Sequence, residues 1–389
     1  MLIEKIRLFD FRNYQSAALY PHPGVNLFFG QNGSGKTNLL EAVHYCALGR
    51  SHRTSQDREV VRRGMEAGWC GVSVRSALGR RDVAVRLMPA EARKKQVQVD
   101  GKRVARLSEL MGLVRCVMFA PEDLMLVKEG PSGRRRFVDM MISQLSPGYF
   151  SALQQYQQAL EQRNAILKQT PRTDPLPAPL LDAFEAEMAR CCQVIIPLRR
   201  ERLQQLQQLA ADKYRAISGR DSEHFSVQYL SCVQAGDSVE ELLGLWQRQR
   251  HDDRQRGVTG AGIHREDLRL SLNGREMKQF ASQGQIRTAA LSLKLAQLEL
   301  FRQLTGEAPV LLLDDVMSEL DRPRRTHLLS ELQQVQTFVT CTDESDLDGC
   351  ANLRAYHVQT GPDGLACVSE SNAGSDVRPA EQEEEPDFD

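Results

Sequence analysis

The order of hydrophobic and polar positions divides the chain into three regions. In the first, residues 1 to about 130, an apolar run at Val25–Phe29 predicts a buried strand, and Asn38–Leu48 have the pattern of a helix. Alternating apolar positions between 69 and 104, with Asp100-Gly101 at a turn, predict an antiparallel β layer. The N-terminal residues are expected to form a further strand.

The second region, about 131–255, is rich in Gln, Arg and Leu at helical spacing. Helices are predicted over Phe150–Lys168 and from Leu180 to about Ile217, separated by the proline-rich segment Pro171–Pro179. Pro197 lies inside the second helix and is expected to kink it. The leucine stripe of this helix predicts packing against its partner helix, as in a short coiled coil.

The third region, about 256–371, returns to an alternation of strands and helices. Leu268–Gly274 predict a strand that ends in a hairpin turn, and Val310–Leu313 and Val335–Val339 predict buried strands. A helix between them is expected to carry one apolar face, made of Ile286, Ala289, Ala290, Leu293, Leu300 and Leu304.

These patterns predict an α/β fold, a mixed sheet with an antiparallel β layer. Residues 1–130 and 256–371 would form one discontinuous head, and residues 131–255 an inserted helical domain. The tail, 372–389, is too polar and acidic to fold alone.

Composition excludes several protein classes. Nine cysteines are scattered without a Cys-x-x-Cys pair, so neither a disulfide framework nor a zinc site is indicated. No apolar run approaches the roughly 18 to 20 residues that a membrane-spanning helix needs. The N-terminus lacks the basic start and apolar core of a signal peptide, so a cytoplasmic protein without a membrane partner is expected.

The charge is unevenly distributed. Residues 372–389 hold seven acids and one base, which leaves 44 acidic and 49 basic side chains in the rest of the chain. A mildly basic body is compatible with a DNA partner. Clusters that offer contacts to DNA phosphates are Arg62-Arg63, Arg93-Lys94-Lys95, Arg134-Arg135-Arg136 and Arg199-Arg200 with Arg202. Intramolecular ion pairs or a solvated helix face are an equal alternative for each cluster.

A phosphate-binding loop stands between the first apolar strand and the first helix. Its residues are Gly30-Gln31-Asn32-Gly33-Ser34-Gly35-Lys36-Thr37. In such a loop, backbone N–H groups and the helix N-terminus surround phosphate oxygens. Lys36 is expected to reach the β- and γ-phosphates of ATP, and the Thr37 hydroxyl to ligate Mg2+.

Two acids follow the apolar strand at Val310–Leu313. Asp314 and Asp315 are expected at the carboxyl end of this strand, the edge at which ligands bind in such sheets. Asp314 is predicted to hold Mg2+ through water, and Asp315 to polarise the attacking water. With Lys36, these acids are the predicted catalytic residues.

A second anion site is predicted 32 residues before Asp314. There, Ser282-Gln283-Gly284-Gln285 form a turn of small and polar residues at the start of the amphipathic helix. Because the phosphate loop already supplies one phosphate site, Ser282, Gly284 and Gln285 are expected to act on the ATP of a second copy. An ATP-dependent homodimer follows from this.

These motifs together resemble the ATP-binding-cassette (ABC-type) heads of SMC-like proteins, with Ser318–Asp321 as their D-loop. Over about residues 1–370 the chain is more closely similar to the RecF family of bacterial recombination-mediator ATPases. The stretches that carry the likeness are Phe11–Tyr14, Gly49–Thr54, Pro131–Asp139 and Asp314–Asp321. By this resemblance Arg12, Asn38 and Arg53 are assigned to the nucleotide, with Arg53 as a γ-phosphate sensor.

Three positions depart from the patterns of such proteins. Gly262–Leu268 read Gly-Ile-His-Arg-Glu-Asp-Leu where the family has Gly-Pro-His-Arg-Asp-Asp-Leu, and Phe119–Asp123 supply no Q-loop glutamine. Asp315 follows the RecF pattern, whereas most cassettes have Glu there. Its shorter side chain suggests a slow, switch-like ATPase.

The resemblance implies a weak, DNA-stimulated ATPase that binds gapped DNA at junctions of single and double strands. It would help to load RecA together with RecO and RecR. A chromosome-organising SMC or zinc-hook protein is disfavoured because the helical insertion has only about 125 residues. A transporter subunit is disfavoured because Thr340–Asp343 lack the expected histidine. An ATP-sensing DNA scaffold with little or no hydrolysis remains an open alternative.

Overall fold

The computed structural model describes residues 1–90, 95–171, 173–232, 239–332, 334–347, 350 and 352–371. The acidic tail at 372–389, and Arg93 and Lys94 of one basic cluster, lie outside the described residues. No helix in the described part of the chain is long and apolar enough to cross a membrane.

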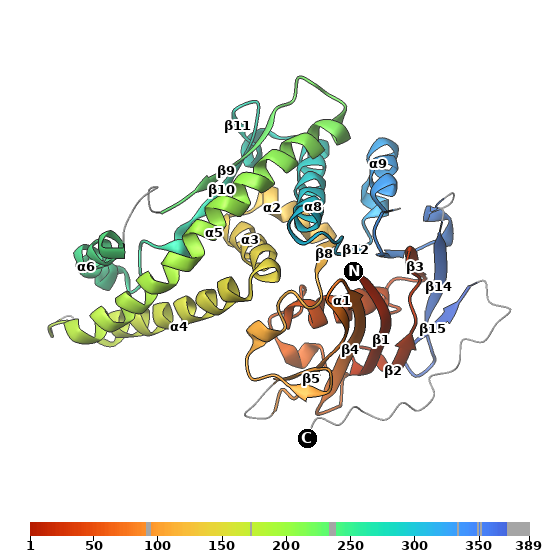
Figure 1. The fold of residues 1–389 in the computed structure, drawn as a ribbon, viewed down its shortest axis with the longest axis horizontal. Coiled ribbons are helices and arrows are strands. Elements are labelled where there is room, and N and C mark those ends of the chain that lie inside the picture. The colour runs from red at the N-terminus through yellow and green to blue at the C-terminus, as the bar shows by residue number, and fades with distance from the viewer. Residues whose placement is uncertain are drawn as a thin grey trace.

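A six-stranded sheet forms the centre of the head (Figure 1). Its order is β15-β14-β3-β13-β12-β8, and all neighbours are parallel except β14 and β15. The strands are β3 (Val25–Phe29), β8 (Cys116–Phe119), β12 (Val310–Asp314), β13 (Thr337–Cys341), β14 (Leu353–Thr360) and β15 (Ala366–Glu370). The predicted apolar runs are therefore confirmed as parallel strands, although Val335 precedes β13.

The predicted antiparallel layer is confirmed as a second six-stranded sheet in the order β2-β1-β4-β5-β6-β7. Its strands are β1 (Leu2–Phe11), β2 (Tyr14–Leu19), β4 (Gly68–Ser76), β5 (Gly79–Leu87), β6 (Lys95–Val99) and β7 (Lys102–Arg103). Asp100 and Gly101 both have positive φ, 52° and 73°, as the turn between β6 and β7 requires.

Helix α1 (Lys36–Leu48) packs between the two sheets, and 11 of its 13 residues are buried. Successive residues of a strand point to opposite faces, so the central sheet serves two cores. Phe28 and Leu312 join the core around α1, whereas Leu27 and Leu313 join the core on the opposite face. That second core includes the helical region, which projects from the head in Figure 1.

The two helices predicted in the second region are confirmed as α4 (Pro147–Gln169) and α5 (Ala178–Ser218). Three further helices accompany them: α2 (Met125–Lys128), which precedes the expected boundary at 131, α3 (Pro131–Leu145) and α6 (Val239–Arg256). Helix α5 is 41 residues long and continues through Pro197, and its leucines at 203 and 206 are buried in the core shared with α4. This confirms the predicted packing of the two long helices.

One strand in this region was not predicted. Strand β9 (Phe225–Leu230) pairs antiparallel with β10 (Asp267–Leu272), which is also paired with β11 (Arg275–Glu276). The prediction of a mostly helical region therefore missed this strand, because β9 pairs with a partner about 40 residues further along the chain. The three-stranded sheet joins residues on both sides of the expected boundary at 255.

The remaining helices are α7 (Met277–Phe280), α8 (Gln283–Thr305) and α9 (Arg322–Leu332), with short 3-10 turns between other elements. Helix α8 buries its apolar face as predicted, apart from Leu304, which is 37% exposed. Leu304 lies one residue before the end of α8, where the core no longer covers the helix.

A buried arginine connects three helices of the projecting region. Arg163 on α4 is fully buried and donates to Glu185 on α5 at 3.0 Å and to Asp253 on α6 at 2.8 Å. A further donor bond reaches Thr259 at 2.7 Å. Since both carboxylates are also buried, the cation compensates charges that water does not reach.

Replacing this cation should destabilise the helical region strongly. In Arg163→Met the hydrocarbon stem is retained, but Asp253 loses its guanidinium partner inside the protein. We expect the free energy of unfolding to fall by about 3–5 kcal/mol, measured by urea denaturation. Arg190→Met is the matched control, because Arg190 is 66% exposed in its pair with Glu187 and should leave the midpoint nearly unchanged. Equal midpoints for the two variants would contradict the role of Arg163.

Candidate nucleotide-binding site

The glycine-rich segment 30–37 connects the end of β3 to the start of α1. Gly30 has a φ of 146°, and a Cβ placed there would lie 2.2 Å from the carbonyl oxygen of Val358. Gly35 has a φ of 114°, and its Cβ would lie 2.8 Å from the Asn13 side chain. Both positions therefore require glycine, because of the backbone conformation and of the neighbouring chain.

Two polar side chains of the loop, those of Ser34 and Lys36, are buried. The Lys36 ammonium donates to the carbonyl oxygens of Gly30 at 2.7 Å and Gln31 at 3.0 Å. The Ser34 hydroxyl is buried and has no hydrogen-bond partner among the described residues. The Lys36 ammonium and the Ser34 hydroxyl are donors of the kind that bind phosphate oxygens.

Asp314 meets the start of α1 at the carboxyl end of the central sheet. The Thr37 hydroxyl donates to Asp314 Oδ1 at 2.7 Å, and the Thr340 hydroxyl of β13 donates to the same oxygen at 2.8 Å. Burial raises the pKa of the Asp314 carboxyl, while the bonds from Thr37 and Thr340 act in the opposite direction. The structure thus brings together the two predicted motifs, which are 277 residues apart in sequence.

Asp315 adopts an uncommon backbone conformation directly after β12. Its φ is 49°, in the left-handed region, and its N–H donates to the Thr340 hydroxyl at 2.9 Å. Such conformations cost free energy in residues other than glycine and gather at functional sites. The conformation turns the chain away from the strand immediately after Asp314.

Two residues that sequence reasoning did not assign to the site hold the loop in place. The Asn13 side chain donates to the carbonyl of Ser34 at 3.1 Å and accepts from the Asn38 amide at 2.7 Å. The Tyr14 hydroxyl donates to the carbonyl of Gly35 at 3.1 Å. The family-like Phe11–Tyr14 segment therefore supports the loop from the β1–β2 turn.

A buried carboxylate organises the arginines around α1. Glu41 is fully buried and accepts both arms of the Arg12 guanidinium, at 2.8 Å and 2.6 Å. It also accepts the Ser51 hydroxyl, and Arg53 lies 4.0 Å away. Glu41 was not among the predicted residues, because one acid inside a helical pattern carries no sequence signal.

Ser51 explains part of the Gly49–Thr54 motif. Besides donating to Glu41, its oxygen accepts from the backbone N–H groups of Arg53 at 3.0 Å and Thr54 at 3.1 Å. This turn places the Arg53 guanidinium 3.2 Å from Asn38 Oδ1. Arg12 and Arg53 therefore both lie beside the first turns of α1, although Arg12 is engaged with Glu41 and with the carbonyl of Glu59.

The second predicted anion site begins α8. Ser282 is the N-cap, with its hydroxyl accepting from the Gln285 N–H at 3.3 Å and the Gln285 side chain accepting in return from the Ser282 N–H at 2.9 Å. Arg324 of α9 donates to the carbonyl of Gly284 at 3.0 Å and pairs with Asp321. Arg324 therefore links the start of α8 to the predicted D-loop.

The signature and the phosphate loop are separate in one chain. Among the described residues, no hydrogen bond or ion pair connects Ser282, Gly284 or Gln285 to residues 30–37. Ser282 is exposed, as are residues 31–33 of the loop. Both motifs are thus accessible to another molecule.

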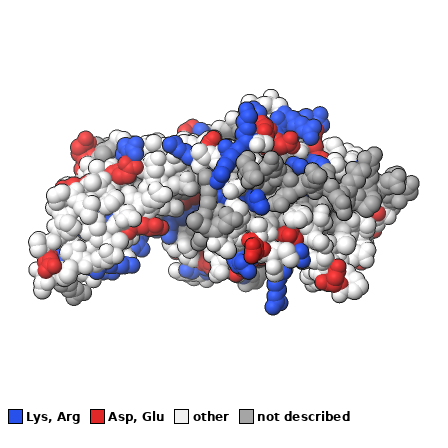
Figure 2. Space-filling view, turned by 90° about the horizontal axis from the view of Figure 1, so that it is seen from below, with Lys and Arg blue, Asp and Glu red and all other residues white. Residues whose placement is uncertain are grey.

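Two arginines of the predicted basic clusters form ion pairs within the protein. Arg134 pairs with Asp267 at 2.7 Å and Arg199 with Asp139 at 2.7 Å and Glu266 at 2.5 Å, all within the protein. For these two arginines, contact with DNA phosphates was the wrong interpretation and intramolecular ion pairing the right one. On the face shown in Figure 2, Lys and Arg gather in separate patches with Asp and Glu between them.

Comparisons with known proteins agree with this geometry. The model of the RecF/RecN/SMC N-terminal domain matches residues 2–362. The chain is 39% identical over 350 residues to the DNA replication and repair protein RecF of Ruminiclostridium cellulolyticum, covering 88% of this chain and 93% of that protein. It is 36% identical over 365 residues to that of Clostridium perfringens, covering 93% and 99%.

Solved structures give the same result. A structure of the recombination mediator protein RecF-ATP in the RecFOR pathway aligns with a TM-score of 0.85 at 34% identity, covering 94% of this chain and 97% of that one. The Smc head domain of Pyrococcus furiosus aligns with a TM-score of 0.55 at 16% identity, covering 95% and 96%, which shows a shared fold.

Removing the Ser51 hydroxyl should disturb the turn that carries Arg53. In Ser51→Ala the buried Glu41 loses one donor, and the N–H groups of Arg53 and Thr54 lose their acceptor. We expect a loss of about 1–3 kcal/mol in the free energy of unfolding and faster amide hydrogen exchange at 53 and 54. The exposed Ser55→Ala is the control; if it matches Ser51→Ala, the turn does not depend on the hydroxyl.

Proposed function

We propose a function on one premise, that the chain belongs to the RecF family of DNA replication and repair proteins. It would bind ATP with Mg2+ and hydrolyse it slowly. In the ATP-bound form two copies would join and hold gapped DNA at junctions of single and double strands. With RecO and RecR as partners, the complex would assist the loading of RecA.

The contact between Thr37 and Asp314 carries the nucleotide part of the proposal. The 2.7 Å hydrogen bond sets an α1 hydroxyl and a β12 carboxylate side by side, next to the glycine-rich loop at the N-terminus of α1. Gly30 to Thr37 would surround the β- and γ-phosphates, with Lys36 exchanging its bonds to the Gly30 and Gln31 carbonyls for phosphate oxygens. The relatives include RecF solved with ATP, which supports this ligand.

The residues present fit a magnesium ion. Thr37 and Asp314 offer oxygen donors only, the ligand type that Mg2+ prefers, and the ion keeps several waters of its own. Bound there, Mg2+ would neutralise charge that develops on the phosphates. Asp314 would hold it through water, and Thr340 keeps the Asp314 carboxylate oriented.

Asp315 is the residue we assign to the attacking water. It directly follows Asp314, and its left-handed backbone directs the chain away from β12 at the edge of the site. Asp315 would orient and polarise water beside the γ-phosphate, and Arg53 would sense that phosphate from the other side of Asn38. A carboxylate one methylene shorter than Glu reaches less far, in keeping with slow turnover.

Dimerisation is proposed from the separation of the two anion sites. A helix N-terminus with a serine cap attracts an anion, yet Ser282 makes no contact with the phosphate loop of its own chain among the described residues. A second copy would bring its signature to this ATP and receive the first copy's signature in return. Because Arg324 contacts both Gly284 and Asp321, it would couple closure of the dimer to the D-loop.

An arginine at the signature should prevent the dimer without affecting ATP binding by the monomer. In Ser282→Arg, a large cation stands where the partner's nucleotide would approach, while residues 30–37 are unchanged. With ATP, light scattering should show a doubled mass for the unaltered chain and a monomer for the variant. Lys36→Met should remain monomeric because it fails to bind ATP.

The control for this experiment is Thr173→Arg, an equally exposed position in the segment between α4 and α5. It should dimerise as the unaltered chain does. A dimer of Ser282→Arg would refute the assignment of the signature, and loss of its ATP binding would place Ser282 in the chain's own site.

Hydrolysis should depend on Asp315 and on the form of DNA. Asp315→Asn removes the charge that polarises water, so the ATPase rate should fall about 10²-fold or more while ATP binding persists. Phosphate release is measured with single-stranded, duplex and gapped DNA, and gapped DNA should stimulate it most. The control is Asp363→Asn, in the exposed turn between β14 and β15. Rates unaffected by Asp315→Asn would remove Asp315 from this role, whereas absence of phosphate release by the unaltered chain with every form of DNA would favour the ATP-sensing scaffold.

A further inference from the structure

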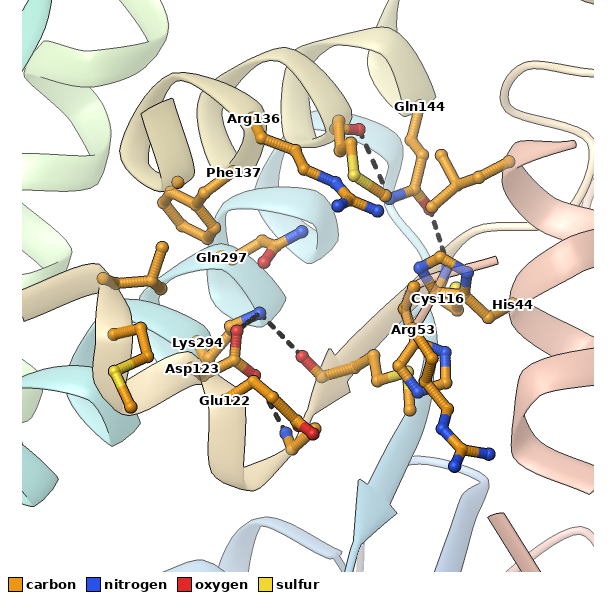
Figure 3. A pocket seen from close by; sticks show the side chains of 18 residues that line it. His44, Arg53, Cys116, Glu122, Asp123, Arg136, Phe137, Gln144, Lys294 and Gln297 are labelled. Carbon is orange, nitrogen blue, oxygen red and sulfur yellow. Dashed lines mark hydrogen bonds and ion pairs between the residues drawn. The ribbon is translucent and has the colours of Figure 1, made fainter. Parts of the chain in front are cut away.

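A cavity of about 370 Å³ lies beside the nucleotide site, and of its lining only Arg53 has a role in the function proposed above. Its walls come from α1 and the segment after it, from β8 and the turn that follows, and from α2, α3 and α8. Figure 3 shows Arg136 of α3, Gln297 of α8 and His44 of α1 around this space. The volume lies within the range of sites for small molecules.

One part of the cavity wall is positively charged and one cation there lacks an acidic partner. Lys294 is compensated by Asp123 at 2.7 Å and also donates to the carbonyl of Met118 at 2.8 Å. Arg136 donates to the carbonyl of Ser51 at 3.2 Å, and no carboxylate of a described residue lies within ion-pair distance of it. Its charge is therefore available to an anion in the cavity.

Neutral polar groups stand near this cation. Burial lowers the pKa of His52 to about 3, with Arg53, Arg12 and Arg136 adding to the effect, so its ring is uncharged at neutral pH. Both ring nitrogens of His52 are buried without a hydrogen-bond partner among the described residues. The Gln297 side chain, 5% exposed, also lines the cavity. Unpaired buried polar groups are costly unless a ligand satisfies them.

Most of the remaining wall is apolar, and its other polar side chains are those of His44, Arg53, Glu122 and Gln144. The large apolar side chains are Leu48, Met118, Met125, Leu126, Phe137 and Met140. Thioether sulfurs make favourable contacts with aromatic rings and adapt to their shape. A ligand with an apolar body and one negatively charged end would match the apolar part and the positively charged part of the lining.

We propose that this cavity is a binding site for a small aromatic monocarboxylate. Its carboxylate would pair with the Arg136 guanidinium and accept from the Gln297 amide, and its ring would lie against Phe137 and the methionines. A single uncompensated guanidinium favours one negative charge over the two of a phosphate monoester. The occupant would touch α1, α3 and α8 at once, and Arg53 connects this wall to Asn38 of the phosphate-loop helix.

Gly133 offers a way to fill the cavity without strain. It lines the cavity from the first turn of α3, and a Cβ at this position meets nothing within 4 Å. Leucine has a higher helix propensity than glycine, so Gly133→Leu should fold at least as well. Ser132→Leu adds the same side chain one residue earlier, at an exposed position outside the cavity.

The test is calorimetric titration of the full-length chain with 2-naphthoate, in saturating Mg-ADP so that the phosphate loop is occupied. We expect saturable one-to-one binding to the unaltered chain and to Ser132→Leu. Binding should weaken about tenfold or more in Gly133→Leu and, through the lost charge, in Arg136→Gln. The neutral 2-naphthalenemethanol should bind about tenfold more weakly than 2-naphthoate to the unaltered chain.

Any of three results would overturn the proposal. Undiminished binding of 2-naphthoate to Gly133→Leu would place the ligand elsewhere, and absence of binding to the unaltered chain would remove the site altogether. Equal affinity for the acid and the alcohol would show that Arg136 selects no anion. Circular dichroism of each variant verifies that the fold is intact.

Discussion

The hydrogen bond from Thr37 to Asp314 depends on the whole order of the central sheet. Asp314 is the last residue of β12, and Thr37 lies in the first turn of α1, the helix that follows β3. In the sheet, β13 lies between β3 and β12. Thr340 on that intervening strand donates to the same carboxylate oxygen. All three strands are parallel, so their carboxyl ends meet at one edge, and parallel strands require long crossover connections. Strands β4 to β7 of the antiparallel layer and the helical region lie within the crossover between β3 and β12.

The buried carboxylate of Glu41 in α1 also determines which residues lie around the phosphate loop. A fully buried carboxylate is tolerated only when donors surround it, and Glu41 obtains them from Arg12 and Ser51. These partners come from the β1–β2 turn and from the segment after α1. The same constraint therefore brings Asn13 against the loop and Arg53 against Asn38, which gives two family-like sequence segments a common physical cause.

Local patterns predicted most elements because their causes are local. The apolar run before Asp314, the glycine loop and the serine cap at Ser282 each carry their own signal over a few residues. Strand β9 was missed because its stabilising partner, β10, lies far along the chain. The ion pairs of Arg134 and Arg199 were undecidable from sequence for the same reason, since a basic run looks alike whether its partners are acids of the protein or phosphates of DNA.

The N-termini of α1 and α8, the two predicted anion sites, differ within a single chain. At α1 the partial positive charge of the helix N-terminus lies beside the phosphate loop. There Lys36 donates to the carbonyl oxygens of Gly30 and Gln31, which phosphate oxygens would replace as its acceptors. At α8 the capping box satisfies only part of the free N–H groups, while Arg324 adds a cation beside Gly284. One end is thus a complete cradle, and the other is a charged, exposed surface without a ligand-binding loop. Such a surface gains most when another molecule supplies the phosphate, which is the physical basis of the assembly proposed above.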